Sequence, residues 1–157
     1  MTIIEVADHI HASDRAGDLT LALRRATSRL ADGDTLRLPA GRHDLRQDCC
    51  EQTMLMVTNH DPCIHSHGLL VRDRRDITID GQGCTLDVHD LVVPIWLEGC
   101  HGVRMRDLHI DRPEPMDGQG EILSVDEERI ELRLDPASNP AWFVHNGILT
   151  FQSRRWR

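Results

Sequence analysis

The sequence contains no lysine and no tyrosine, and it is poor in the other aromatic residues. With only three Trp and two Phe among 157 residues, a folded core has to be built from Leu, Ile and Val. No stretch approaches the roughly 20 apolar residues of a transmembrane helix. The first residues, MTIIEVADHIH, lack the basic and apolar regions of a secretory signal. As written, the sequence predicts a protein that stays in the cytoplasm.

Positive charge is also scarce, because 26 acidic residues outnumber 18 basic ones and give a formal net charge of −8. Nucleic-acid backbones and anionic membranes attract clustered positive charge, so we expect neither as a partner. The five cysteines are an odd number and include the adjacent Cys49 and Cys50, which does not suit a disulfide framework. We expect reduced thiols instead.

One amphipathic helix is predicted near the N-terminus. Asp18 can cap its start, and Gly33 can end it in the left-handed conformation. The apolar residues that fall on one face at helical spacing are Leu19, Ala22, Leu23, Ala26 and Leu30. We expect this helix to cover an exposed strand edge.

From Asp34 onward the pattern changes to short strands of three to five residues, each bounded by Gly, Pro, Asp or Asn. They are predicted within 35–38, 54–57, 68–71, 77–79, 95–97 and 103–105. The segment 76–86, DITIDGQGCTL, is predicted to break at Gly81 and Gly83, where a sharp corner needs residues that tolerate a positive φ.

These strands repeat along the chain. Sliding the sequence by 26 residues places GLLVRDRRDITID (68–80) over PIWLEGCHGVRMR (94–106). The apolar residues that then coincide are Leu69 with Ile95, Val71 with Leu97, Ile77 with Val103, and Ile79 with Met105. A period between about 20 and 50 residues is typical of a solenoid. Because each repeat contains strands and no helix, the pattern predicts a parallel β-helix.

The pattern changes again after Pro113 and Pro115. Residues 121–125 and 129–134 alternate with period two around a polar turn, which predicts a half-buried antiparallel hairpin, and 148–151 is expected to begin another strand. The sequence therefore predicts an all-β protein in two parts. Residues 1–115 would form the capping helix and first coils of the β-helix, and 116–157 the incomplete start of an antiparallel β module.

Several segments of the sequence are familiar from known proteins. GDTLRLPAGRHDL (33–45) and ITIDGQG (77–83) occur widely in pectate-lyase-like β-helices and indicate the fold. More particular are TNHD (58–61), His89, Pro94, Trp96 and LHIDRP (108–113). Together these segments resemble the N-terminal part of glycoside hydrolase family 110. Family members are bacterial α-1,3-galactosidases on a right-handed parallel β-helix. The resemblance covers nearly all of this chain but only the first part of a typical member, and the later hairpin is similar to the family's β-barrel module.

The resemblance implies that terminal α-1,3-linked galactose is removed from glycans, with inversion and without a metal or other cofactor. Inversion needs a general acid and a general base about 6.5–9.5 Å apart. In the family we expect these acids in later coils, so the catalytic residues are not identified here and the chain is expected to be an inactive fragment on its own. The parent proteins are often exported.

Five residues are candidates for binding the sugar. The amide, imidazole and carboxylate of Asn59, His60 and Asp61 all bond hydroxyl groups well, although the same segment also suits a turn closed by Pro62. His89 is a further candidate, with a plain turn histidine as the alternative. Trp96 lies between two inward residues, which is typical of an outward-facing strand position. From there its aromatic ring can stack on a pyranose ring.

Other polar residues give weaker indications. The acidic residues around the coils are Asp80, Asp87, Asp90, Glu98, Asp107, Asp111 and Glu114, but such residues are normal at solvent-exposed turns. His60, Cys63, His65 and His67 suggest a metal site. Zinc sites usually add a second ligand pair at loop spacing, and none is evident, so no metal is predicted.

Two other functions remain open. The chain could be a carbohydrate-binding β-helix without catalytic acids, or a different pectate-lyase-like enzyme that acts on uronates. The second would need a Ca²⁺-binding carboxylate cluster or basic residues facing the substrate, and neither is recognisable. The sequence does not predict the oligomeric state or the preferred glycan.

Overall fold

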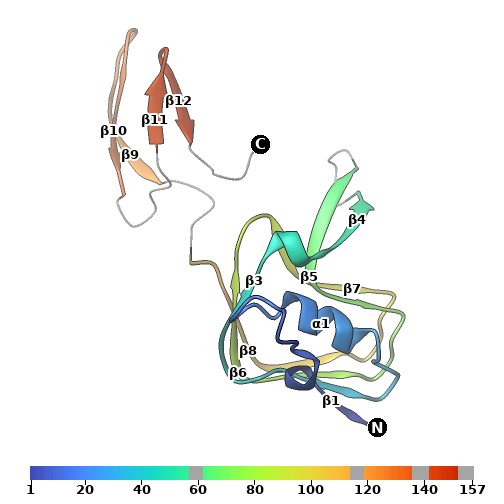
Figure 1. Cartoon of the computed structure of the whole chain (residues 1–157). Helices are drawn as coiled ribbons and strands as arrows, with labels where there is room; N and C mark the ends of the chain where they lie inside the picture. The colour runs from blue at the N-terminus through green and yellow to red at the C-terminus, as the bar shows by residue number, and fades with distance from the viewer. Residues whose placement is uncertain (57–61, 114–118, 136–141, 152–157) are drawn as a thin grey trace. The chain divides into compact units, whose positions relative to one another are not determined.

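The computed structural model describes residues 1–56, 62–113, 119–135 and 142–151. These residues are mostly in strands, with one α-helix, so the predicted all-β class is confirmed (Figure 1). The chain divides into two compact units, Met1–Arg112 and Pro113–Arg157. Within the described residues, no helix has the length and apolar character needed to cross a membrane.

The first unit contains a five-stranded sheet in which every pairing is parallel. Its central strand is β6 (Thr78–Val88), which pairs along one edge with β2 (Thr35–Arg37) and β3 (Gly41–Leu45). Along its other edge β6 pairs with β8 (Arg104–Asp111). The remaining strand, β1 (Ile3–Glu5), pairs with β2.

A second sheet of three strands belongs to the same unit. Its central strand is β5 (Cys63–Arg72), which pairs antiparallel with β4 (Glu51–Leu55) and parallel with β7 (Val92–Glu98). Two 3₁₀ turns, η1 (Val6–His9) and η2 (Gln47–Cys49), connect elements in this unit. The strands β5 and β6 have 10 and 11 residues, longer than predicted, because partners on both edges extend their hydrogen bonding.

The register of the parallel strands reproduces the repeat seen in the sequence. Leu69 pairs with Ile95 and Val71 pairs with Leu97, so each partner lies one repeat further along the chain. The same spacing relates Ile79 to Met105. A one-residue slip would turn each side chain to the opposite face of its sheet, so this register decides which residues enter the core.

The predicted break at Gly81 and Gly83 is wrong, because β6 continues through both residues. The segment is a bulge instead. Asp80 pairs with Arg106 and Cys84 pairs with Leu108, so β6 takes a longer path than β8 between these two pairs. Gly83 has a φ of 79°, as a corner residue would, whereas Gly81 is required for a different reason. A Cβ atom on Gly81 would overlap the carbonyl group of Asp107 on the neighbouring strand.

The helix α1 (Thr20–Thr27) packs its apolar face into the same core cluster as residues of both sheets. All five predicted apolar residues are at most 2% exposed, and the Asp18 carboxylate accepts the backbone N–H of Thr20 at 2.8 Å. The helix ends earlier than predicted, before Leu30 and Gly33. The N–H groups of Arg29 and Leu30 donate to carbonyls three residues back, as in a 3₁₀-helix, so the α-helix does not continue through them.

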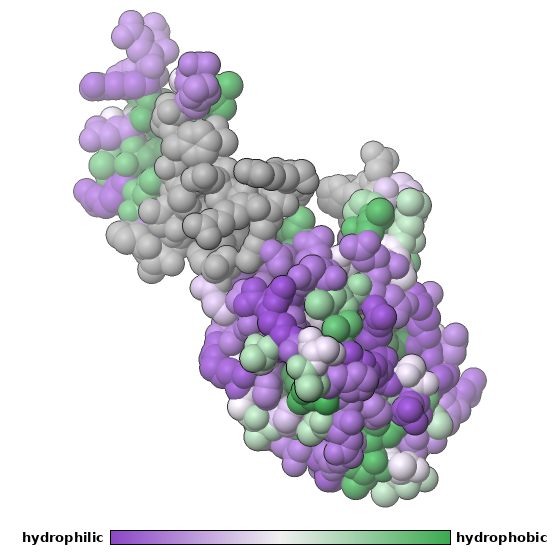
Figure 2. All heavy atoms as spheres, in the orientation of Figure 1, coloured by the Kyte–Doolittle hydropathy of each residue, from purple (hydrophilic) through white to green (hydrophobic). Residues whose placement is uncertain are grey.

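The core joins α1 to the inward residues of both sheets. Leu36, Leu45, Leu69, Ile79 and Leu86 are fully buried in one cluster with the helix. Figure 2 shows hydrophilic residues over most of the visible face of the first unit, with apolar residues in small patches between them. Aliphatic residues therefore supply the core of this unit, as the shortage of aromatic residues requires.

The described residues of the second unit form two antiparallel hairpins. The predicted one pairs β9 (Gly120–Val125) with β10 (Ile130–Leu134), and the other pairs β11 (Trp142–His145) with β12 (Ile148–Phe151). The expectation that the first hairpin is half-buried is wrong, since Ile122, Val125 and Ile130 are each more than 60% exposed. Two strands alone offer too little surface to enclose an apolar face.

The contact at Gly81 can be tested by substitution. We expect Gly81→Ala to destabilise the first unit by about 3 kcal/mol, because the new methyl group must displace the backbone of β8. Gly83→Ala is the matched control, since its Cβ meets no atom and only the positive φ costs about 1 kcal/mol. Urea unfolding of both variants measures the difference, and equal destabilisation would contradict the close approach.

Candidate functional site

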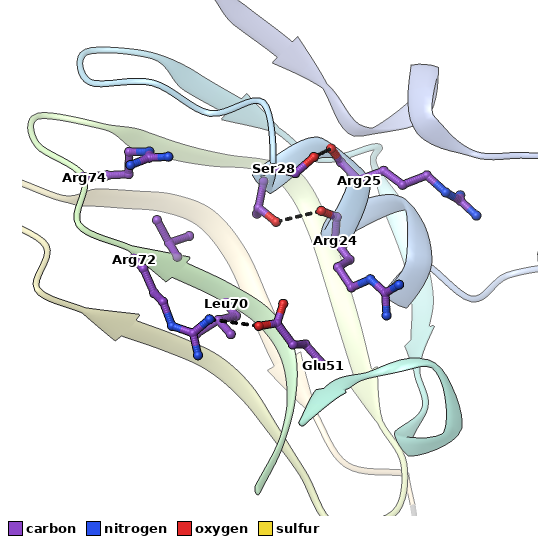
Figure 3. Close-up of a pocket in the computed structure, with 9 residues that line it drawn as sticks. Arg24, Arg25, Ser28, Glu51, Leu70, Arg72 and Arg74 are labelled. Carbon is purple, nitrogen blue, oxygen red and sulfur yellow. Dashed lines mark hydrogen bonds and ion pairs between the residues drawn. The ribbon is translucent and has the colours of Figure 1, made fainter. Parts of the chain in front are cut away.

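A hollow lies between α1 and β5 in the first unit (Figure 3). It has a volume of ≈ 430 Å³ and is lined by the second half of the helix, by Glu51 of β4 and by Leu70 of β5. Four arginines line it as well: Arg24 and Arg25 from the helix, and Arg72 and Arg74 from β5 and the turn after it. A chain of net charge −8 thus has a locally cationic concave surface.

Carboxylates neutralise two of these arginines. Arg25 donates hydrogen bonds of 2.7 and 2.8 Å to the two oxygens of Asp14, and this bonding holds the pKa of Asp14 well below its usual range. Arg72 donates to Glu51 at 2.9 Å and to Glu98 at 2.8 Å. The arginine of β5 therefore links the two neighbouring strands of its own sheet.

The other two arginines have no carboxylate partner among the described residues. Arg74 donates to the backbone carbonyls of Leu30, at 2.6 Å, and Asp73, at 3.1 Å. No hydrogen bond or ion pair joins the Arg24 guanidinium to the residues that the structure describes. The hollow can therefore bind a polar ligand, but Glu51, the carboxylate that lines it among the described residues, is bonded to Arg72 and is not free for acid–base catalysis.

His89 lies at the corner that follows β6. Its Nε2 is 2.9 Å from Oδ1 of Asp44 on β3, and its backbone N–H donates to the carbonyl of Leu45. Burial raises the pKa of Asp44, but hydrogen bonds from His89 and Arg46 outweigh this effect and leave it below its usual value. An ionised carboxylate thus fixes the orientation of an imidazole that is 13% exposed.

Trp96 lies on β7, on the face opposite to Ile95, which packs against the core. Its ring centre is 5.5 Å from that of His67 on β5, with the two rings tilted by 51°. The indole Nε1 and the His67 Nδ1 are both buried without a hydrogen-bond partner in the described part of the chain. Trp96 is half-buried in this contact, so only part of its ring surface is available to a ligand.

The structure does not bring the predicted sugar-binding residues together. His89 contacts β3, whereas Trp96 contacts β5, and no interaction between the two is found among the described residues. Asn59, His60 and Asp61 lie outside the described residues, in the connection between β4 and β5. Their predicted role in binding is therefore a proposal that rests on the sequence.

The cysteine and the two histidines of β5 do not all point to one common position. Cys63 Sγ lies 3.2 Å from His65 Nε2, but His67 directs its Nε2 to Thr53 Oγ1, at 2.7 Å.

Burial raises the pKa of the Cys50 and Cys84 thiols, to about 12 and about 11, which makes them poor nucleophiles.

Several acidic residues of the coils are held by arginines. Arg106 donates to Asp80 at 2.8 Å and lowers its pKa, and Arg42 does the same to Asp111 at 2.7 Å. A general acid needs a raised pKa, so neither carboxyl suits that role. Glu114 lies outside the described residues.

Two polar residues of these sites were missed by the sequence analysis. Arg74 bonds to the carbonyl of Leu30, and Asp44 bonds to the imidazole of His89. Each pair is far apart in the sequence, and no local pattern marks either residue. Only the pairing of distant strands and the packing of the helix bring the partners together.

Comparison with known proteins identifies relatives but no family model that matches. "Alpha-1,3-galactosidase B" of Bacteroides thetaiotaomicron is 27% identical over 80% of this chain and 20% of the relative. "Alpha-1,3-galactosidase A" of Bacteroides fragilis is 29% identical over 78% of this chain and 21% of the relative. "Alpha-1,3-galactosidase B" of Phocaeicola vulgatus is 30% identical over 71% and 19%.

The chain thus spans about a fifth of the length of these curated relatives. Over most of its own length it is similar to proteins named α-1,3-galactosidase, and the predicted resemblance to such enzymes is confirmed at that level.

The buried His67 should make stability depend on pH. Burial lowers the pKa of His67, with smaller effects from the charges of His65 and Arg72. Below about pH 6.5 the unfolded chain therefore takes up a proton that the folded chain resists, and stability falls as the pH falls. We expect a slope of up to about 1.4 kcal/mol per pH unit as the pH falls below about 6.5, measured by urea unfolding.

Replacing the imidazole identifies its contribution. In His67→Gln this part of the pH dependence should disappear, whereas the control His109→Gln, on the exposed face of β8, should retain it. Identical profiles in both variants would show that other groups cause the slope.

Proposed function

We propose that this chain forms the front part of a glycoside hydrolase of family 110 that removes terminal α-1,3-linked galactose from glycans. The observation that supports this most directly is the similarity to several proteins named α-1,3-galactosidase over about four fifths of the chain. The substrate of the whole protein would be an oligosaccharide or glycan with terminal galactose.

The proposed scaffold is a right-handed parallel β-helix. Parallel strands whose partners lie one repeat apart support this proposal, as does a helix whose apolar face completes the core. Residues 1–115 would contain the cap and the first coils. Residues 116–157 would begin an antiparallel β-barrel module, in line with the two antiparallel hairpins found there.

The proposed reaction is inverting hydrolysis without a metal. It needs one carboxylic acid to protonate the leaving oxygen and one carboxylate to activate water, about 6.5–9.5 Å apart. Asp80 and Asp111 have lowered pKa values, and Glu98 is bonded to Arg72, so these residues do not suit the general acid. We therefore assign the catalytic pair to other coils of a longer protein and expect this chain alone to be inactive.

The role of this chain in the proposed enzyme is to bind the sugar. The proposed contacts are made by Asn59, His60, Asp61, His89 and Trp96. The carboxylate of β3 orients the imidazole of His89, and Trp96 presents part of an aromatic ring on the outer face of the β4–β5–β7 sheet. Aromatic faces and hydrogen-bonding side chains are the groups that recognise pyranose rings and their hydroxyls.

A second candidate is glycan binding without hydrolysis. It is favoured by the cationic hollow, which offers Arg24, Arg74 and two hydroxyl groups but no free carboxylate among the described residues. The two functions differ in one measurable respect, because only the first releases galactose.

The test uses the natural protein that contains this chain, incubated with an oligosaccharide ending in α-1,3-linked galactose. We expect galactose to be released as the β-anomer, detected by NMR at early times. Trp96→Ala and His89→Ala should raise KM by about tenfold, which corresponds to about 1.4 kcal/mol of binding. The control His109→Ala should leave KM unchanged.

Two outcomes would contradict the proposal. Binding of the oligosaccharide without any released galactose would support the binding function instead. Release of galactose with unchanged KM in both variants would remove His89 and Trp96 from the site.

A further inference from the structure

Three side chains that can ligate a metal converge where the segment before α1 meets η2. Asp18, Asp48 and Cys49 each offer one ligand atom, and these atoms all lie within 4.8 Å of one another. They come from two parts of the chain that are separated by α1, β2 and β3. Neither the proposed glycosidase reaction nor the sugar-binding residues use this cluster.

Asp18 has an unsatisfied buried oxygen. The residue is 6% exposed, and its Oδ1 accepts the backbone N–H of Thr20 at 2.8 Å. Its Oδ2 is buried and has no hydrogen-bond partner in the part of the chain that the structure describes. An ionised carboxylate oxygen is unfavourable in a buried position unless a cation or a donor compensates it. The predicted N-cap is wrong by one residue, because Leu19 is the N-cap of α1, but the hydrogen bond from Thr20 still holds Asp18 in place with one oxygen left for a ligand.

The other two ligands are adjacent residues of η2. Asp48 Oδ2 bonds to Arg15 at 2.9 Å, but both side chains are more than half exposed, so solvent screens this pair. A carboxylate has a second oxygen, which can coordinate a metal while this ion pair persists. Cys49 is a free, half-buried cysteine. The neighbouring Cys50 is turned elsewhere, since its Sγ donates to the carbonyl of Arg46 at 3.2 Å.

From this arrangement we propose that Asp18, Asp48 and Cys49 bind a Zn²⁺-type divalent transition metal. A thiolate ligand selects zinc over Ca²⁺ and Mg²⁺, which prefer oxygen ligands. Three protein ligands and one water complete the four-coordinate geometry that zinc favours. When the metal binds, the thiol proton leaves to solvent and the thiolate sulfur donates its electron pair to the metal.

The metal would fasten the capping helix to the first strands. Asp18 lies just before α1, and η2 follows β3, so one ion links the start of the helix to the turn after β3. Such a site exists only in the folded chain, and metal binding therefore stabilises the fold. This role is structural and does not depend on the proposed reaction, so it can hold or fail independently of it.

The test is a titration of the whole chain with Co²⁺ under reducing conditions, followed by absorbance. We expect one equivalent of Co²⁺ to produce a thiolate-to-cobalt charge-transfer band, which Zn²⁺ in excess removes. Cys49→Ser should abolish the band. Asp18→Asn should weaken binding at least about tenfold, while the amide oxygen can still accept the N–H of Thr20 and keep the fold intact. Cys50→Ser is the matched control and should retain the band.

A second measurement distinguishes metal binding at this cluster from nonspecific metal binding. Zn²⁺ should raise the melting temperature of the unaltered chain and of Cys50→Ser by similar amounts, and that of Asp18→Asn by clearly less at the same concentration. The proposal is overturned if no band forms, or if the band persists in Cys49→Ser and disappears in Cys63→Ser. The latter result would place the metal at Cys63 and His65, whose side chains are in contact on β5.

Discussion

Parallel pairing of strands one repeat apart is the constraint on which the first unit depends. It places Leu69 over Ile95 and Ile79 over Met105, so equivalent positions face the same side in successive strands. Because side chains alternate along a strand, this register determines which residues enter the core and which project outward. The apolar face of α1 is buried only because the inward residues of both sheets meet it in a single cluster.

The same register organises the charges. Arg42 on β3 bonds to Asp87 on β6 and Asp111 on β8, and so it connects three strands in succession. Arg72 on β5 makes the equivalent link to β4 and β7. These acidic residues follow from strand pairing and need no catalytic explanation. Asp18 differs from them, because one of its buried carboxylate oxygens has no partner among the described residues.

Much of this fold could be predicted from the sequence, because its main signals are local or periodic. The repeat of apolar residues identified the paired positions, and helical spacing identified apolar residues that the structure buries around α1. The path of β6 through Gly81 could not be predicted, since it depends on the backbone of Asp107 approaching from another strand. The early end of α1 depends on hydrogen bonds to carbonyls three residues back, which the apolar spacing does not encode.

The candidate sites were harder to predict than the fold. The cationic hollow requires α1 to pack beside β5, and the metal-ligating cluster forms only when the segment before the helix meets the turn after β3.

The most direct test of the strand register is NMR on the isotope-labelled chain. The account predicts cross-strand NOEs between the backbone protons of Leu69 and Ile95, and between those of Ile79 and Met105, in the pattern of parallel strands. NOEs that connect Leu69 and Ile79 to other segments, or that show antiparallel pairing with these partners, would contradict the stacking of successive repeats.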